Sequence, residues 1–475
     1  MTSMAARDAT MFWLSRRTAN DVFLLYCFAE TDTAADELRA FVTARVEHIP
    51  DLRIRLQRIP GDLAYPRWVP AEFMSQQIVH HQPDGLSWPL LLTRMGELLG
   101  TGVDATEFPW RIHVFRRVRD APQSTEPVVV VLLQLSHALA DGTRAAAIAR
   151  ALFAPAADPV VHTHPGVSVD NSAKPPVGPA KTRAQPVDTC GQTCGWIANH
   201  ANPRWLGVLR FPRQVVTTAW RGRAAYLAQR KLAELTATGE VPPPTTGFAP
   251  CALNPTSPVV DRDVRMLVID ADDFRIPGKT VTVVALTAIS RALSDYLAEN
   301  GERPARLGTA LPMALPTQST SRNNYRGLSI DLHIDEPDLR LRAELIADDL
   351  TTRRERALNP LLSAQDRVGE TVPSVLAARD VQHADLDNVP AILDGNTVVS
   401  SVYRGPTDLT LAGAPVLFTG GFPALGTVMH LTHGIHGIGE TITLSVHSDP
   451  KVVPDPDRYL QLLAHALKTV VAAHR

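Results

Sequence analysis

Hydrophobic and polar positions in the first 154 residues alternate between a strand-like and a helix-like period. Apolar runs at Phe23–Phe28, Arg111–Arg116 and Val128–Leu135 have the length and composition of strands. Thr33–Val46 repeats its apolar residues every three to four positions, which predicts an amphipathic helix, and the alanine-rich Thr143–Phe153 predicts a second helix. Strands and helices alternating in this way predict an α+β lobe.

The same alternation returns between about residue 259 and residue 475. The pattern predicts strands at Val264–Ile269, Leu307–Met313, Leu328–Ile334 and Thr441–Ser448, and helices at Thr282–Glu299, Leu341–Ala357 and Arg458–His474. A chain of 475 residues is long enough for two large hydrophobic cores. We therefore expect two α+β lobes, each a mixed β-sheet with packed helices, and a ligand cleft between them.

Residues 155–258 differ in composition and periodicity from the regions on either side. Proline, threonine, serine and glycine are frequent, as in AKPPVGPAK and EVPPPTTG, and periodicity is lost at both ends. Helical character is confined to the middle, between about Pro203 and Thr236, and Pro212 is expected to break any single long helix there. The sequence predicts an N-terminal lobe over 1–154, a crossover linker over 155–258 and a C-terminal lobe over 259–475.

Bulk composition is that of a globular protein, with 45% hydrophobic residues, 20% charged residues and a formal net charge of -2. The near-neutral charge gives no reason to expect a nucleic-acid partner. Four cysteines are too few for a disulfide framework, and the Cys190 and Cys194 pair lacks a second ligand pair for zinc, so we expect no metal site. We find no signal peptide and no run of about 18 apolar residues, which predicts a cytoplasmic protein.

The segment after the strand Val128–Leu135 is the best candidate for chemistry. The strand runs into Ser136-His137, a short turn reaches Asp141-Gly142, and a helix begins at once. An imidazole at a strand end, with an ordinary pKa of about 6.5, is suited to take a proton from a hydroxyl. Asp141 is expected to stabilise the turn, through backbone N–H groups or an arginine, and Gly142 to let the chain turn without a Cβ clash.

A purely structural interpretation of the same residues is also open. Aspartate before Gly-Thr and a helix is a good N-cap by itself. A histidine at a strand end can equally be a hydrogen-bonded core residue. The bare spacing His-x-x-x-Asp-Gly therefore does not establish catalysis.

The segment resembles the HHxxxDG signature of the bacterial wax ester synthase/acyl-CoA:diacylglycerol acyltransferase family, with Ser136 in place of the first histidine. Other stretches that resemble family segments are Pro50-Asp-Leu-Arg-Ile-Arg-Leu, Tyr65-Pro-Arg-Trp-Val, Phe108-Pro-Trp-Arg-Ile-His, Arg322–Gly327 with Ile330-Asp331-Leu332, Ser400–Val402 with Gly405-Pro406, Leu411–Ala414, and Asp449-Pro450 through Pro454-Asp455-Pro456. These stretches fall in both predicted lobes and leave out the linker.

The resemblance implies a chloramphenicol-acetyltransferase-like fold of two lobes and a ternary-complex acyl transfer. In such a transfer His137 would be the general base, Asp141 structural and Gly142 conformational. The implied donor is acyl-CoA as a co-substrate, with no bound cofactor, and the implied acceptor is a diacylglycerol or a long-chain alcohol. Candidates for lining the cleft are Asn323, Ser401 and Thr282. The last two replace residues of the family pattern, the Asn of S-N-V and the Asn of an N-D pair, and Ser136 replaces its first histidine.

A basic and aromatic segment lies in the middle of the linker. Between Arg204 and Lys231 there are basic and aromatic residues but no acidic one, and the residues we select as a possible lipid interface are Trp205, Arg210, Arg213, Trp220, Arg221 and Arg223. This composition is typical of segments that lie at a membrane surface. It is equally compatible with a solvated basic helix that its aromatic residues pack onto the protein. An RNA-binding role is disfavoured because no recognition module is visible.

The sequence thus predicts an acyl-CoA-dependent O-acyltransferase that makes triacylglycerol or wax esters, cytoplasmic or peripheral at the inner membrane or lipid droplets. Two alternatives stay open. One is an acyltransferase of the same fold that uses a non-glyceride lipid or a polyketide alcohol. The other is a non-catalytic protein that binds acyl-CoA or lipid.

Overall fold

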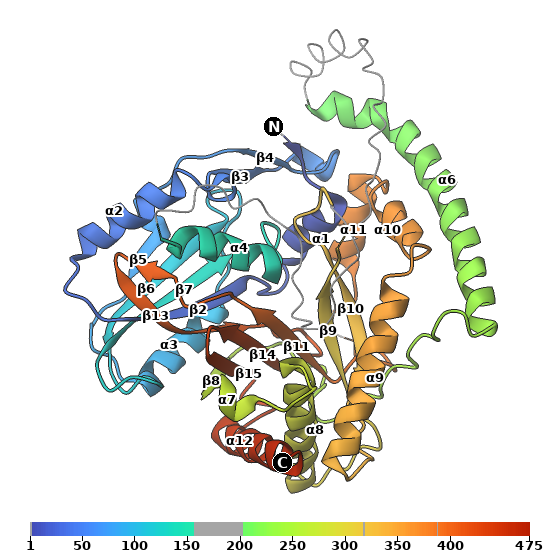
Figure 1. The fold of residues 1–475 in the computed structure, drawn as a ribbon. Helices are drawn as coiled ribbons and strands as arrows, with labels where there is room; N and C mark the ends of the chain where they lie inside the picture. Colours follow the sequence, from blue (N-terminus) through green and yellow to red (C-terminus); the bar gives the residue numbers. More distant parts are fainter. Residues whose placement is uncertain (1, 156–202, 317–318, 387) are drawn as a thin grey trace, which may run out of the picture.

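The computed structural model describes residues 2–155, 203–316, 319–386 and 388–475. In Figure 1 this part of the chain forms two sheet-centred lobes that lie side by side, with one long helix set apart along the edge of the molecule. The arrangement confirms the predicted α+β architecture of two lobes.

The first sheet has six strands in the order β12-β13-β2-β7-β6-β5. They are β2 (Val22–Ala29), β5 (Ile78–His80), β6 (Trp110–Val118), β7 (Val128–Leu135), β12 (Thr410–Leu411) and β13 (Ala414–Phe422). One face is covered by α1 (Ala6–Leu14), α2 (Ala35–Val46) and α4 (Gly142–Phe153), and the other by α3 (Trp88–Leu99). Since β7 is covered on both faces, every one of its residues is buried, which explains its unbroken apolar run.

The second sheet also has six strands, in the order β10-β9-β11-β14-β15-β8. They are β8 (Asp263–Asp270), β9 (Gly308–Ala314), β10 (Tyr325–Asp331), β11 (Thr397–Tyr403), β14 (Leu431–Ile438) and β15 (Thr441–Ser448). Its core is completed by α7 (Ala271–Phe274), α8 (Val281–Glu299), α9 (Leu339–Ala357) and α12 (Pro456–Ala473). β10 begins three residues before its predicted start at Leu328, because Tyr325 already pairs with Ala314 of β9.

Smaller elements close the ends of the lobes. A three-stranded sheet in the order β1-β4-β3 contains β1 (Thr2–Ser3), β3 (Ile54–Gln57) and β4 (Arg67–Pro70). Three short 3₁₀ turns are η1 (Pro50–Leu52), η2 (Pro60–Asp62) and η3 (Ser75–Gln77). Two further helices are α10 (Ser363–Gly369) and α11 (Ser374–His383), and α11 packs against α1.

One part of the predicted C-terminal lobe belongs to the first sheet. β12 and β13 fall within residues 259–475, yet β13 pairs antiparallel with β2. β13 also packs beside β14 and β15 of the second sheet, so that it joins the two lobes. The approach is close: a Cβ on Gly434 would lie 2.3 Å from the carbonyl oxygen of Gly421, and only glycine fits there. The predicted division at residue 259 therefore does not separate the two sheets.

The linker contributes the long helix α6 (Pro203–Ala237), drawn in green at the edge of Figure 1. Helix was predicted here, but the prediction that Pro212 would break it is wrong, since α6 continues through that residue. The ribbon bends near its N-terminal end in Figure 1, as a helix does when proline removes one backbone hydrogen bond without ending it. Cys190 and Cys194 lie outside the described residues.

One described helix, α8, is long and apolar enough to cross a membrane by length and composition. Two thirds of its apolar window is buried inside the protein, where it packs in the core of the second lobe. Its composition is therefore explained by its central position in that core.

Candidate active site

β7 carries His137 to the boundary between the lobes. The strand is paired on one side with β2 and on the other with β6, so its end is held in place. The N–H of Ser136 donates to the carbonyl oxygen of Pro109 at 2.8 Å, and the Ser136 carbonyl accepts from Leu139 N–H at 2.8 Å. Ser136 is buried, and its backbone fixes the turn that follows the strand.

The two ring nitrogens of His137 differ in their surroundings. Nδ1 is enclosed and makes no well-formed hydrogen bond to a described residue, whereas Nε2 is not enclosed and the side chain is partly exposed. Burial lowers the pKa of His137 below its ordinary value of 6.5. The carbonyl of His137 itself, the Asn323 side chain, and the charges of Asp141 and Asp8 act in the opposite direction. The lowered pKa favours the neutral imidazole at pH 7, and Nε2, the ring nitrogen that is not enclosed, is the candidate proton acceptor.

Asp141 links the turn to the opposite lobe. One carboxylate oxygen accepts from the N–H of Arg144 at 2.8 Å, which caps α4. The other accepts from the N–H of Asn324 at 2.9 Å, in the loop before β10. Of the two roles expected for Asp141, the structure shows the one through backbone N–H groups.

Gly142 does not have the conformational role expected for it. It is the first residue of α4, and a Cβ there would make only an ordinary contact with Val402 Cγ2 at 3.9 Å. No positive φ and no close backbone approach requires glycine at this position.

Asn323 does not line an open cleft but supports His137 from behind. Its side-chain Nδ2 donates to the His137 carbonyl at 2.8 Å and to Asp8 Oδ1 at 2.9 Å. Asp8, on α1, also accepts from the backbone N–H of Asn323 at 3.0 Å and of Arg322 at 2.9 Å, and from Ser321 Oγ at 2.7 Å. Both Asp8 and Asn323 are buried. Together they fix the backbone on which the imidazole is mounted.

Asp8 was missed at the level of sequence, although a signal was present. Asp8, Ala9, Phe12 and Trp13 are the buried residues of α1. This spacing places them on one helical face, so a carboxylate stands among apolar side chains in the core. A charged group in such a position needs partners from elsewhere in the fold, and the loop before β10 supplies them.

A second carboxylate orders the same loop. Asp51 Oδ1 accepts from Arg322 Nη1 at 2.8 Å, and Asp51 also accepts two hydrogen bonds from Arg144 on α4. Burial alone would raise the pKa of Asp51, but the hydrogen bonds and charges of the two arginines hold it below its ordinary value. The pairing again ties the start of α4 to the loop from the second lobe.

Thr282 and Ser401 are brought together by the fold. Thr282 lies in the first turn of α8 and Ser401 on β11, and their hydroxyl oxygens are 2.9 Å apart. Ser401 precedes Val402, which faces Gly142. Two of the residues that depart from the family pattern thus hydrogen-bond to each other, on the face of β11 opposite to Val402.

Comparison with known proteins gives this geometry a context. Residues 323–470 match the family model described as the WS/DGAT C-terminal domain, and the match begins at Asn323. This region of the chain is therefore similar to the WS/DGAT C-terminal domain. The predicted resemblance to the wax ester synthase/diacylglycerol acyltransferase family is confirmed, and the matched region includes Asn323, which holds the His137 carbonyl.

Solved structures share the fold over the whole chain. The wax ester synthase/diacylglycerol acyltransferase from Marinobacter aquaeolei VT8 matches with a TM-score of 0.59 and 16% identity, over 100% of both chains. A starter condensation domain of rhizomide synthetase, in complex with C8-CoA and Leu-SNAC, matches with a TM-score of 0.53 and 10% identity, over 99% of this chain and 94% of that one. The first condensation domain of the CDA synthetase matches with a TM-score of 0.53 and 13% identity, over 98% of this chain and 95% of that one. No curated protein matches the chain.

The predicted lipid-interface residues lie on α6, outside the WS/DGAT C-terminal domain. The side chains of Trp205, Arg210 and Arg213 lie outside the described residues. Trp220 and Arg223 are exposed, as expected for such a surface. Arg221 is not part of it: its Nη1 donates to the carbonyl of Arg367 at 2.8 Å, so the side chain faces the body of the protein.

Proposed function

We propose that this protein is an acyl-CoA-dependent O-acyltransferase that forms triacylglycerol, wax esters or both, with His137 as the general base. The observation that carries the proposal is the state of the imidazole. It is neutral, its Nδ1 is enclosed, its Nε2 is open, and its backbone is held by both lobes. Such an arrangement suits a base that must be positioned before the substrate arrives.

The transfer needs no covalent intermediate on the protein. Nε2 of His137 takes the proton of the acceptor hydroxyl while the alcohol oxygen forms a bond to the thioester carbonyl carbon. The carbon–sulfur bond then breaks, and the departing thiolate of CoA takes the proton from the imidazolium. The products are an ester and free CoA, and the histidine returns to its neutral form.

Acyl-CoA is proposed as the donor because two observations agree. A family model named for wax ester synthase and diacylglycerol acyltransferase matches the C-terminal region. A structure of the same fold was determined with C8-CoA bound. The acceptor is proposed to be a diacylglycerol or a long-chain alcohol, and no further cofactor is required by the chemistry.

The proposal is tested by acceptor dependence. Purified protein is incubated with palmitoyl-CoA, and release of the CoA thiol is followed with a diacylglycerol, with hexadecanol and with no acceptor. We expect release above the hydrolytic background only when an acceptor is present, and the better acceptor identifies the main product. Binding of palmitoyl-CoA without release in any of the three reactions would instead indicate a lipid-binding protein.

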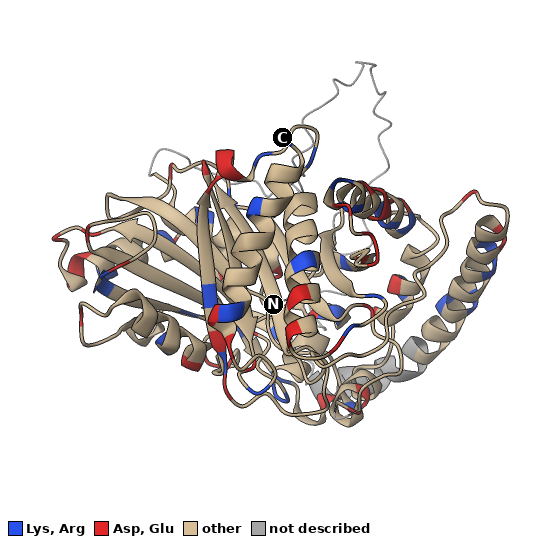
Figure 2. Ribbon diagram, turned by 90° about the horizontal axis from the view of Figure 1, so that it is seen from below, with Lys and Arg blue, Asp and Glu red and all other residues tan. Residues whose placement is uncertain are grey.

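We further propose that α6 brings the enzyme to a membrane or lipid-droplet surface. Ala225 and Leu232 are buried on the side of α6 that packs against the protein, near α10. The opposite side exposes Val216 at 69%, Trp220 at 69% and Leu227 at 49%, with the exposed Arg223 between Trp220 and Leu227. Figure 2 shows basic residues along this helix, which projects from the body. Exposed aromatic and aliphatic groups between cations suit a surface with anionic headgroups.

Sedimentation with vesicles tests this surface. Vesicles of phosphatidylcholine with about a third phosphatidylglycerol should pellet the wild type, and less so as salt rises, because screening weakens the arginine contribution. The double variant Trp220→Ala with Arg223→Glu should stay in the supernatant. The control is Lys468→Glu on α12, an exposed charge reversal elsewhere on the surface. Equal pelleting of both variants would exclude α6 as the contact.

A further inference from the structure

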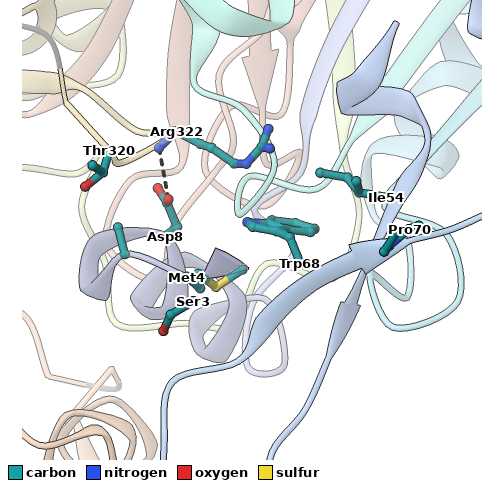
Figure 3. Close-up of a pocket in the computed structure, with 9 residues that line it drawn as sticks. Ser3, Met4, Asp8, Ile54, Trp68, Pro70, Thr320 and Arg322 are labelled. Atoms are coloured by element: carbon teal, nitrogen blue, oxygen red, sulfur yellow. Dashed lines mark hydrogen bonds between the residues drawn. The ribbon is translucent and has the colours of Figure 1, made fainter. Parts of the chain in front are cut away.

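A cavity of about 260 Å³ lies where the small β1-β4-β3 sheet, the start of α1 and the loop before β10 meet. Figure 3 shows its lining, with Trp68 of β4 on one side and Asp8 of α1 on another. The remaining lining residues are Ser3, Met4, Ala5, Ile54, Pro70, Thr320 and Arg322. His137 does not line this cavity, so it is separate from the open side of the imidazole.

The charged groups around the cavity compensate one another. The Asp8 carboxylate is surrounded by donors from the loop before β10, and the Arg322 guanidinium pairs with Asp51. Asp51 in turn pairs with Arg144, so two carboxylates face two guanidinium groups. A charged ligand would enter without a counter-charge, which is unfavourable in a partly enclosed site. The cavity therefore favours an uncharged ligand.

One hydrogen-bond donor in the cavity lining has no acceptor among the described residues. Trp68 is 7% exposed, and its Nε1 is buried without a hydrogen-bond partner among the described residues. In Figure 3 the nitrogen-bearing edge of the indole is directed toward Asp8 across the cavity, with Arg322 above the ring. Buried donors in proteins are nearly always satisfied, so an acceptor oxygen is expected at this edge. Met4, Ile54 and Pro70 provide apolar contact for the rest of the ligand.

One residue of the cavity lining, Asp8, also belongs to the hydrogen-bond network that holds the backbone of His137. Asp8 lines the cavity and also holds the Asn323 side chain, which holds the His137 carbonyl. A ligand that contacts Asp8 thus lies two hydrogen bonds away from the backbone of the base. Its volume is slightly below the roughly 300 Å³ at which pockets hold drug-sized ligands, so it fits a polar end with a few carbons rather than a whole acyl chain.

We propose that this cavity binds the uncharged, oxygen-bearing end of a lipid, with a hydroxyl or ester oxygen accepting from Trp68 Nε1. The assignment of the ligand as a lipid rests on the proposed acyltransferase function. Two sources carry this chemistry: an ester group of a diacylglycerol acceptor, whose free hydroxyl would react outside the cavity at His137, and a neutral lipid that acts as an effector. In either case occupancy communicates with His137 through Asp8 and Asn323.

Direct binding tests the proposal without requiring turnover. Titration calorimetry of the full chain with 1-decanol, decanoate and decylamine compares three ligands of equal chain length and different charge. We expect 1-decanol to bind most tightly, and Trp68→Phe to weaken it about tenfold, the usual effect of losing one hydrogen bond to a buried donor. Thr320→Phe, which fills the cavity from an exposed loop, should weaken it as well.

The matched control is Trp88→Phe, a tryptophan of the same 7% exposure on α3, which does not line the cavity. It should bind 1-decanol within twofold of the wild type. Unchanged binding in both Trp68→Phe and Thr320→Phe overturns the proposal. Tighter binding of decanoate or decylamine overturns the assignment of an uncharged ligand.

Steady-state kinetics then separates the two sources. If the occupant is the ester group of the acceptor, Trp68→Phe raises KM for the diacylglycerol and leaves kcat nearly unchanged. If it is an effector, decyl acetate, which has an ester oxygen but no hydroxyl, changes kcat of the wild type and not of Trp68→Phe. If the protein binds 1-decanol through Trp68 but releases no CoA with any acceptor, the assignment of the cavity stands and the proposed acyltransferase function is wrong.

Discussion

At the scale of single residues, the site depends on a histidine whose backbone is held from the second lobe. Asn323 Nδ2 bridges the His137 carbonyl and Asp8 Oδ1, at 2.8 and 2.9 Å. None of these contacts touches the reacting nitrogen. Their effect is to fix where Nε2 points, and position errors of about 1 Å are costly in catalysis.

The Asn323→Ala variant measures this effect. We expect kcat to fall about 100-fold while KM for palmitoyl-CoA changes little, because the substrate site remains and only the base is displaced. Asn323→Asp places two carboxylates side by side at Asp8 and should be no better. A rise in KM with unchanged kcat would mean that Asn323 contacts substrate instead.

The pH dependence of kcat/KM reports on the base itself. Burial lowers the pKa of His137, and the neutral imidazole is the active form, so activity should be lost only as pH falls through a value below 6.5. The Asp8 charge raises this pKa, so Asp8→Asn should move the acid limb to still lower pH. An acid limb that lies above 6.5, or that Asp8→Asn moves upward, would contradict the assignment.

At the scale of elements, α4 begins where the lobes meet, and the Asp141 carboxylate accepts a hydrogen bond from each lobe. Asp141→Ala removes the cap of α4 and the contact with Asn324 N–H, and we expect a loss of about 2 kcal/mol in the free energy of unfolding. Asp338, the exposed N-cap of α9, provides the comparison, since Asp338→Ala removes a cap alone and should cost about 1 kcal/mol. Urea unfolding of both variants gives the difference, and equal losses would show that the lobe contact contributes nothing.

Elements with a strong local period could be predicted from the sequence, and elements defined by partners could not. The bounds of β7 and β15 are as predicted, because the run of apolar residues in the sequence coincides with the run of buried residues in each strand. β13 was missed because Gly420 and Gly421 interrupt its pattern, and those glycines are needed where it lies against the second lobe. His137 and Asp141 could be found from the chain, whereas Asp8 acquires its role only through a loop more than 300 residues away.

At the scale of the whole molecule, buried histidines make the fold sensitive to acid. Burial lowers the pKa of His433 and of His447 to about 3. The unfolded chain binds protons at about 6.5, so stability is complete above that pH and falls as pH decreases toward 3. Asp21, whose pKa burial raises to about 6, acts in the opposite direction, since its contribution is lost as pH rises through that value.

This linkage predicts a large loss of stability between pH 7.5 and pH 5. Each of the two histidines should contribute about 2 kcal/mol of destabilisation at pH 5. Denaturant unfolding at the two pH values measures the change. His433→Gln should reduce the stability difference between the two pH values by about 2 kcal/mol, the contribution of one histidine, even if it lowers stability at both. Equal stability of the wild type at pH 7.5 and pH 5 would show that these imidazoles are not buried as described.

The central claim is that His137 removes the proton from the acceptor. The most direct test follows CoA thiol release from palmitoyl-CoA with a saturating acceptor, for the wild type and for His137→Ala, after denaturant unfolding has shown both to be equally folded. The account predicts acceptor-dependent release by the wild type and a loss of about 10²–10⁴-fold in the variant, the usual contribution of a general base. Equal acceptor-dependent rates in the two proteins would contradict it, because the transfer would then proceed without this imidazole.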